Sequence, residues 1–183
     1  MRSAIAVTNQ IVGSQKNSSQ LKNDQSIEQF LTFALAEDRQ ALLPTRQLLE
    51  IVNVNLSQIT AIAGLHPSVM GIYNWRGDVI WVVDLASLLG YPPLYAQEYN
   101  LAKFQDRCHI LFVRSQDLVV GFAVHHVGQM VRCDTSKIQS SVLSFSNQLM
   151  PDGFSGYWLS GNNETLLVLD GDAIMRVVQA FSA

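Results

Sequence analysis

The sequence is poor in charge, in cysteine and in long hydrophobic runs, and each shortage argues against a class of function. Only 15% of the 183 residues are charged and the formal net charge is −3, so the chain lacks the basic field that draws phosphate backbones to a protein. Nucleic acid is therefore not an expected partner. The two cysteines, Cys108 and Cys133, are too few for a disulfide framework and fit the reduced thiols of a cytoplasmic protein.

The hydrophobic runs are too short to place the chain in a membrane. The run VIWVV at 79–83 is typical of them, whereas a membrane-spanning helix requires about 18 residues. At the start of the chain only residues 4–7 are continuously apolar, which is too little for the core of a signal peptide. We therefore expect a cytoplasmic protein with no direct membrane insertion.

Hydrophobic residues are abundant, at 48%, which is enough for the core of one ordinary domain or two small subdomains. Residues 1–28 are the exception, since twelve of them are Ser, Asn or Gln. A segment with so little apolar surface cannot offset the entropy lost on ordering. We expect it to be a flexible polar extension, with the folded domain at 29–183.

Short strand-like runs dominate the folded part, and polar turns separate them, as in small barrels or a sandwich. The predicted strands are 30–35, 40–44, 48–54, 79–83, 109–113, 118–127, 129–133 and 165–169. A C-terminal helix is expected after Asp172, since apolar residues recur there at the helical spacing of Ile174, Val177, Val178 and Phe181. That helix should dock on a barrel and close the fold.

A weak internal repeat divides the chain into two halves. A shift of 79 residues superposes Phe33 on Phe112, and a shift of 86 superposes 78–84 on 164–170. Each half then reads as strand, acidic turn and strand, followed later by acidic turn, buried strand and Asp. Two similar barrels are the simplest explanation of this pattern.

The stretch 70–90 carries the most specific pattern in the chain. It contains a polar turn formed by Asn74, Arg76, Gly77 and Asp78. The apolar run Val79–Val83 follows, which suits a strand covered on both faces. Asp84 can then cap a short helix at 85–89, because its carboxylate can accept the free N–H groups of the first turn.

Four parts of the sequence together resemble the CheW family, the coupling proteins that join chemoreceptors to the histidine kinase CheA. The strongest is GIYNWRG at 71–77 with the strand after it, and the others are 48–51, 118–131 and 164–170. The resemblance covers about 29–178. It implies a mainly β fold of two small five-stranded SH3-like barrels that share a core, with short helices and a C-terminal helix.

The resemblance also implies where the barrels lie and what they do. They would occupy roughly 30–93 and 105–170, with possible strand exchange. The protein would be a non-enzymatic adaptor without a cofactor, recruited from the cytoplasm to membrane-associated receptor arrays. Its partners would be the regulatory domain of a CheA-like histidine kinase and the cytoplasmic tip of a methyl-accepting receptor, and its output chemotaxis, phototaxis or type IV pilus motility.

Arg76 is the residue to which the resemblance gives the most weight. It implies that Arg76 lies at the seam between the barrels and pairs with Glu50, because a buried guanidinium needs a carboxylate. Direct contact with a partner and a plain surface position remain as alternatives. The expected partner-binding or inter-barrel site contains Tyr73, Asn74, Trp75, Arg76, Gly77 and Glu50, with the aromatic rings of Tyr73 and Trp75 in the turn as a contact surface.

The chain departs from the family pattern in places. His125 stands where the family usually has Asp, and 53–55 replaces a more apolar approach to the next loop. These departures bear on the identity of the partners more than on the fold. The polar extension and the tryptophans Trp75 and Trp81 suggest a specialised paralogue, serving a pilus-motility or light-responsive pathway.

Metal and nucleophile chemistry find little support in the sequence. Cys108 and His109 are adjacent, as are His125 and His126, and adjacent side chains of a strand point to opposite faces. No spacing converges three ligands, so no metal is expected. The chain also offers no nucleophile turn of known mechanics, so a hydrolase is not expected.

Two readings compete with those above. Asp84 and Asp170 could act as paired carboxylates, but a helix-starting sequence follows each, so we expect structural caps. The alternative to an adaptor is a barrel that binds nucleic acid or another ligand. That alternative requires basic residues interleaved with exposed aromatics, whereas the twelve Lys and Arg residues here are scattered.

Overall fold

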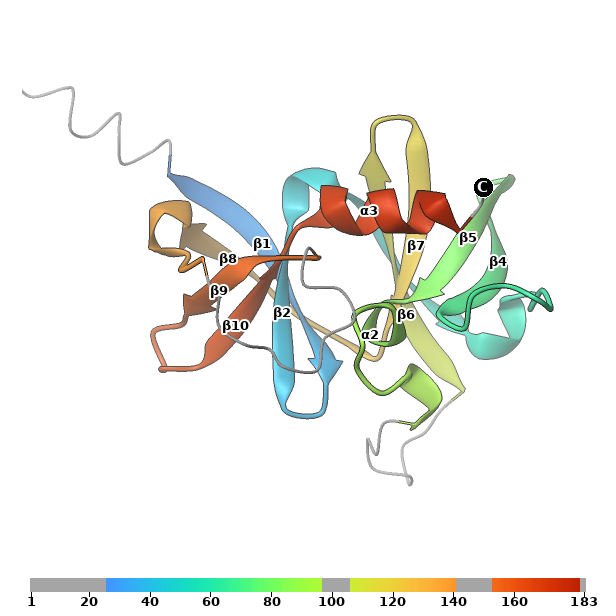
Figure 1. The fold of residues 1–183 in the computed structure, drawn as a ribbon, viewed down its shortest axis with the longest axis horizontal. Helices are drawn as coiled ribbons and strands as arrows, with labels where there is room; N and C mark the ends of the chain where they lie inside the picture. Colours follow the sequence, from blue (N-terminus) through green and yellow to red (C-terminus); the bar gives the residue numbers. More distant parts are fainter. Residues whose placement is uncertain (1–25, 97–105, 141–152, 182–183) are drawn as a thin grey trace, which may run out of the picture.

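The computed structural model describes residues 26–96, 106–140 and 153–181, which form two five-stranded sheets and a few short helices (Figure 1). The first sheet has the order β8-β1-β2-β10-β9. Its strands are β1 (Ile27–Ala36), β2 (Arg39–Pro44), β8 (His126–Asp134), β9 (Phe154–Leu159) and β10 (Thr165–Leu169). The second sheet has the order β3-β6-β7-β5-β4. Its strands are β3 (Leu48–Asn55), β4 (Val69–Trp75), β5 (Asp78–Asp84), β6 (Arg107–Ser115) and β7 (Leu118–Val124).

The predicted mainly β fold is confirmed, with each sheet curled into a small barrel. The helix α2 (Leu85–Leu88) follows β5, and α3 (Gly171–Ala180) follows β10 and lies across the junction of the two barrels (Figure 1). Single 3-10 turns connect other strands and include η1 (Thr45–Gln47), η2 (Leu56–Gln58), η3 (Leu94–Ala96) and η5 (Thr135–Lys137). No helix in the described ranges is long and apolar enough to cross a membrane.

The two halves of the chain repeat the same pairings in the same order. β1 pairs antiparallel with β2 and β8, and β6 pairs likewise with β7 and β3. In each barrel a parallel pair follows, β2 with β10 and β7 with β5, and the last pair is antiparallel. These equivalences agree with the shifts of 79 and 86 residues seen in the sequence.

The barrels do not coincide with the contiguous ranges 30–93 and 105–170. Those ranges are the two repeats, and each barrel takes two strands from one repeat and three from the other. β3 follows β2 in the chain but belongs to the second sheet, and β8 follows β7 but belongs to the first. The exchange therefore involves most of the strands.

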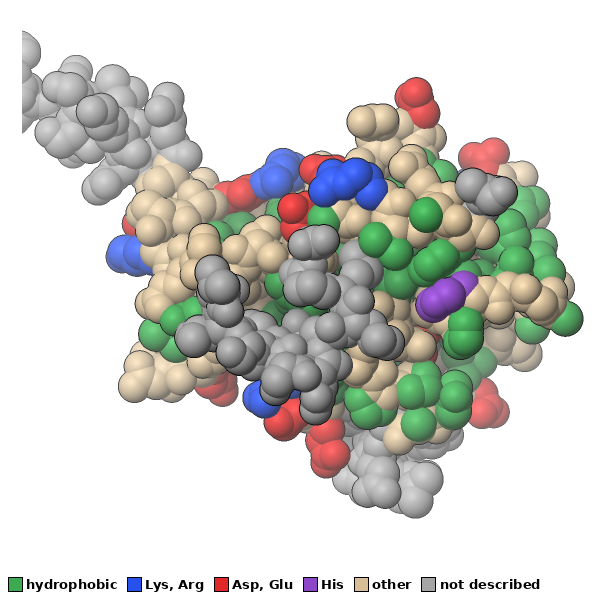
Figure 2. Space-filling model, viewed as in Figure 1, with side chains coloured by type: hydrophobic (Ala, Val, Ile, Leu, Met, Phe, Trp, Pro, Cys, Tyr) green, Lys and Arg blue, Asp and Glu red, His purple; other side chains and the backbone are tan. Residues whose placement is uncertain are grey.

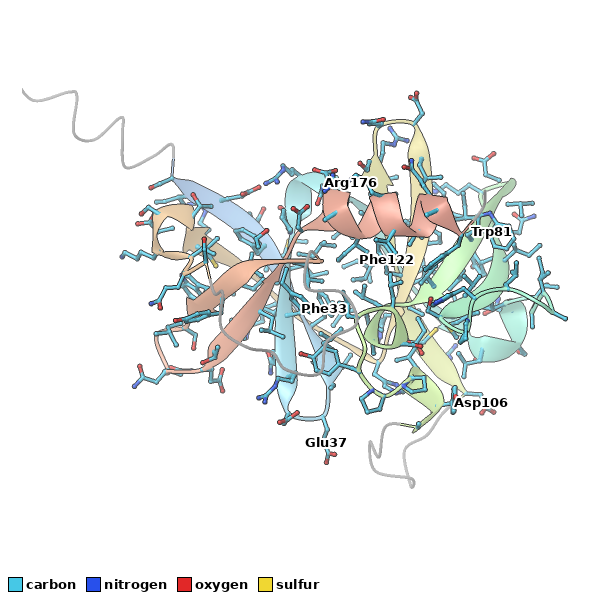
Figure 3. All side chains as sticks on the ribbon, in the orientation of Figure 1. Phe33, Glu37, Trp81, Asp106, Phe122 and Arg176 are labelled. Carbon is cyan, nitrogen blue, oxygen red and sulfur yellow. The ribbon has the colours of Figure 1, made fainter. Side chains whose placement is uncertain are left out.

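The largest hydrophobic cluster lies between the barrels. It joins Phe33 and Leu43 of the first sheet to Leu111 and Phe122 of the second, together with residues of both helices. Figure 3 labels Phe33 and Phe122 in this central region, below α3. Each barrel also has a smaller interior cluster of its own. The helices therefore cover a core that belongs to both sheets.

Two strands and one boundary differ from the sequence prediction. No strand was predicted at β4 or at β9, because a glycine with positive φ interrupts each, Gly71 at +144° and Gly156 at +150°. The folded part begins before Gln29, since Ile27 and Glu28 pair with β8 and Glu28 also forms an ion pair with Arg46. The remainder of the predicted extension, 1–25, lies outside the described residues.

Substitution of Gly71 by alanine should destabilise the second barrel. A Cβ atom there would lie 2.1 Å from the carbonyl oxygen of Thr60, which accepts the backbone N–H of Ile72, and the φ of +144° is strained for alanine. We expect Gly71→Ala to lower the free energy of unfolding by about 2–4 kcal/mol in urea titrations. Gly161→Ala is the control, since a Cβ atom there meets open space. Equal stability of the two variants would contradict the role given to Gly71.

Candidate functional site

The β4–β5 hairpin ends in a two-residue loop, Arg76-Gly77, that holds an arginine in a strained conformation. Both residues have positive φ, +56° at Arg76 and +97° at Gly77, as a type I′ turn requires. The Asn74 Oδ1 accepts the backbone N–H of Gly77 at 3.0 Å and closes the turn. Glycine or asparagine would relax the first position, so the arginine there is unexplained by folding alone.

Four side chains meet at the open end of the second barrel, and we call Phe112, Trp75, Arg76 and Glu50 the mouth stack. The Trp75 ring stacks on the fully buried Phe112 with centroids 4.6 Å apart and planes 15° apart. The Arg76 Cζ lies over the Trp75 ring, 5.3 Å from its centroid. The Glu50 Oε2 accepts both the indole N–H of Trp75 at 2.8 Å and the Nη2 of Arg76 at 2.9 Å.

The Glu50–Arg76 pair does not lie at the seam between the barrels. Glu50 is on β3 and Arg76 follows β4, and these strands are the two edges of the second sheet. The pair therefore joins the edges of one barrel. The Arg76 side chain is 70% exposed and that of Glu50 is 32% exposed, so the expectation of a buried pair is also wrong. The physical reason is that Arg76 occupies the tip of a hairpin, where the described residues leave its side chain open to solvent.

Tyr73 and Trp75 lie within β4 and not in the turn as predicted. Both are half-buried and pack on the interior of the second barrel, with the Tyr73 ring 6.1 Å from that of Phe112. Asn74, between them, is exposed and points to the other face. The strand was missed in the sequence, so the alternation that places the two rings inside was missed with it.

Both predicted caps are present. Asp84 is almost fully buried and accepts the backbone N–H groups of Ser87 at 3.0 Å and Leu94 at 2.8 Å. Burial raises the pKa of Asp84 above its ordinary value of 3.8, and the hydrogen bonds from Leu94 and Ser87 partly offset this rise. Asp170 accepts the N–H of Ala173 at 2.9 Å at the start of α3. Each carboxylate thus accepts backbone N–H groups, Asp170 at the start of α3 and Asp84 both at the start of α2 and at the start of η3.

Both cysteines and two of the histidines, His109 and His125, have structural roles. Burial raises the pKa of Cys108 and of Cys133 to about 11, so both remain thiols near neutral pH. The Nδ1 of His109 donates to the carbonyl oxygen of His125 at 3.1 Å, and the Nε2 of His125 donates to that of Leu94 at 2.7 Å. Among the described residues no three potential ligands are grouped to hold a metal ion.

A second feature of the surface is an apolar cavity of about 270 Å³ beside the end of α3. It is lined by Leu65, His66, Val69, Trp81, Val83, Val178 and Phe181, and the His66 ring stacks on Phe181 with centroids 4.2 Å apart. Figure 3 labels Trp81 close to this end of α3. Figure 2 shows hydrophobic side chains gathered over the same region, while Lys, Arg, Asp and Glu are scattered over the rest of that face.

The mouth stack should contribute little to stability through the ion pair alone. An exposed pair is worth about 1 kcal/mol or less, and Glu50 keeps the indole N–H when Arg76 is removed. We expect Arg76→Ala to lower the free energy of unfolding by at most about 1 kcal/mol, with a coupling near 0.5 kcal/mol in the double-mutant cycle with Glu50→Ala. A loss of about 3–5 kcal/mol for Arg76→Ala would instead indicate a buried pair.

Asp84 should make stability fall with rising pH. Because its pKa is raised in the folded protein, the folded state binds more protons than the unfolded chain as the pH rises through and above 3.8. The free energy of unfolding of the wild type, minus that of Asp84→Asn, should therefore decrease as the pH rises from about 4. Urea titrations of both proteins across the acid range measure this difference. A difference that increases with pH would show that the hydrogen bonds outweigh burial.

The comparisons with known proteins agree on one family. A family model described as the CheW-like domain matches residues 29–179. The chain is 23% identical over 107 residues to Chemotaxis protein CheV3 of Helicobacter pylori. These residues are 58% of this chain and 32% of that protein. The chain is also 29% identical over 82 residues to Chemotaxis protein CheW of Bacillus subtilis. These residues are 45% of this chain and 47% of that protein. Less than half of either relative is therefore spanned.

A solved structure has the same fold. The scaffolding protein TtCheW of Thermoanaerobacter tengcongensis superposes with a TM-score of 0.66 at 20% identity, over 80% of this chain and 86% of that one. The family model covers most of the chain, including both barrels and nearly all of α3. The chain belongs to the CheW-like domain family.

Proposed function

We propose that the protein is a non-enzymatic signalling adaptor that couples methyl-accepting chemoreceptors to a CheA-like histidine kinase. Membership of the CheW-like domain family supports this function, as do relatives described as chemotaxis proteins and a structural neighbour described as a scaffolding protein. The committed carboxylates and the un-ionised, buried thiols leave the described residues with little equipment for acid–base or nucleophilic catalysis.

The observation that carries the proposal is the exposed arginine at the tip of a strained turn. The turn requires positive φ at this position, and arginine adopts it at a cost that glycine would avoid, as residues at functional positions can. Arg76 projects from the mouth stack with its side chain 70% exposed while Glu50 holds it on one side. Arginine is enriched at the centres of protein interfaces, where its planar donors select carboxylates and carbonyls.

The partners we propose are the regulatory domain of the kinase and the cytoplasmic tip of the receptor, with Tyr73, Asn74, Trp75, Arg76, Gly77 and Glu50 at or around the contact. The protein would act in the cytoplasm, at receptor arrays on the membrane. Chemotaxis is the output named for the relatives, and the two tryptophans Trp75 and Trp81 and the polar extension of this chain favour a specialised pathway such as phototaxis or type IV pilus motility.

Binding of the full chain to a kinase regulatory domain and to a receptor cytoplasmic fragment from the same cell tests the proposal. For at least the kinase domain we expect a dissociation constant in the micromolar range or below. This corresponds to a binding free energy on the order of −8 kcal/mol or more favourable. Arg76→Ala should weaken binding about tenfold or more while the melting temperature changes little, because the pair is exposed. Isothermal calorimetry measures the dissociation constant, and thermal unfolding measures the melting temperature.

Arg39→Ala is the matched control for that experiment. Arg39 also forms an exposed ion pair beside a hairpin loop, with Asp38 at 3.4 Å, but it lies on the first barrel. The Arg39→Ala variant should bind both partners like the wild type. If the folded wild-type protein binds neither partner, or if Arg76→Ala and Arg39→Ala bind equally, the proposed function is wrong in its partners or in its site.

A further inference from the structure

The mouth stack contains a residue whose role is not explained by core packing alone. Trp75 fills the open end of the barrel by stacking on Phe112, and phenylalanine or leucine could fill that space as well. Neither could donate a hydrogen bond, whereas the indole N–H of Trp75 donates to Glu50 at 2.8 Å. The same ring lies under the Arg76 guanidinium. One side chain therefore contacts the buried core, the carboxylate and the exposed cation at once.

The carboxylate is fixed by Trp75 independently of Arg76. The Glu50 Oε2 receives the indole N–H and the Arg76 Nη2 at the same oxygen, at 2.8 and 2.9 Å. Because the ring is held on the fully buried Phe112, its N–H is a donor of fixed position, unlike one on a mobile surface chain. Glu50 thus offers Arg76 a stationary acceptor, and it remains hydrogen-bonded when the guanidinium turns toward another acceptor.

The guanidinium keeps donors for a partner. Arginine has five N–H donors in a rigid plane, and the ion pair with Glu50 is made from Nη2. Among the described residues Glu50 is the single acidic partner of Arg76, and the side chain is 70% exposed. The unused donors therefore face solvent in a plane that the Trp75 ring and Glu50 together fix. A planar fork of donors matches a carboxylate, which can accept two of them.

We propose that Trp75 is a positioning residue for binding of the kinase regulatory domain, holding Glu50 and the Arg76 guanidinium so that the free donors of Arg76 meet a carboxylate of that domain. This inference rests on the proposed function, because it needs a partner that contacts the barrel mouth. It adds that the partner contributes a carboxylate to the contact, and that the half-buried Trp75 positions the arginine that recognises this carboxylate.

Conservative variants separate positioning from packing. Trp75→Phe keeps a ring on Phe112 and under Arg76 but removes the N–H, and Trp75→Leu removes both the N–H and the aromatic face. We expect affinity for the kinase regulatory domain to fall by about threefold for Trp75→Phe and about tenfold for Trp75→Leu. Arg76→Lys keeps the charge but loses the fork, and it should also lose about tenfold. Trp158→Phe, a half-buried tryptophan of the first barrel, should bind like the wild type.

A readout without the partner distinguishes positioning from a general loss of structure. In NMR spectra the side-chain Nε–H signal of Arg76 should be sharp and resolved in the wild type and averaged toward the free-arginine position in Trp75→Leu, with the backbone signals of the first barrel unchanged.

The salt dependence of binding should be shallower for Arg76→Ala than for the wild type, because a charge pair is lost.

The failures of the two proposals are distinguishable. If Arg76→Ala loses binding while Trp75→Phe and Trp75→Leu bind like the wild type, the positioning role is overturned and the proposed function stands. If Arg76→Lys binds like the wild type, the carboxylate fork is overturned. If Arg76→Ala itself binds like the wild type, the barrel mouth is not the contact, and both the site and this inference are wrong.

Discussion

The hydrophobic core between the two barrels is the feature on which the rest of the structure depends. Each barrel interior is small, and the shared cluster holds more buried residues than the two interiors together. The shared cluster contains residues of both sheets, so each sheet buries apolar surface of the other and the two stabilise each other. Asp84 and Asp170 cap the two helices that cover the junction, and the two caps occupy equivalent places in the repeats.

This shared core leaves the outer end of the second barrel free for function. Residues that face the junction are fixed by packing, whereas the mouth stack closes an end that the other barrel does not cover. Its exposure rises stepwise from Phe112, fully buried, through Trp75 to Arg76 at the surface. A surface cation is thereby connected to the core through one aromatic ring, whose packing restrains the position of the exposed charge.

Local patterns predicted the elements that are stabilised locally. The apolar run of β5, the capped starts of α2 and α3, and the acidic hairpin turns were all visible in the sequence, because their signals lie within a few neighbouring residues. β4 and β9 were not, because Gly71 and Gly156 interrupt their alternation and their backbone approaches a segment brought close by the fold. The assignment of strands to barrels was also beyond the sequence, since β2 pairs with β10 from the far end of the chain.

The site was predictable in part for the same reason. The Glu50–Arg76 pair followed from the family resemblance, but its exposed position on one barrel depends on the edge-to-edge closure of the second sheet, which no local pattern contains. The inward direction of Tyr73 and Trp75 depends on β4 being a strand, so the error in secondary structure became an error in the site.

The exchange of strands between the barrels has a consequence for how such a chain could arise. A polypeptide with one repeat alone would hold two strands of one barrel and three of the other, so neither sheet could be completed within it. Two copies could complete both barrels only by domain swapping, each inserting its last three strands beside the hairpin of the other. The present chain has the architecture of such a swapped homodimer fused end to end. Because the two repeats are covalently linked, they meet at a high effective concentration and cannot dissociate as two subunits would.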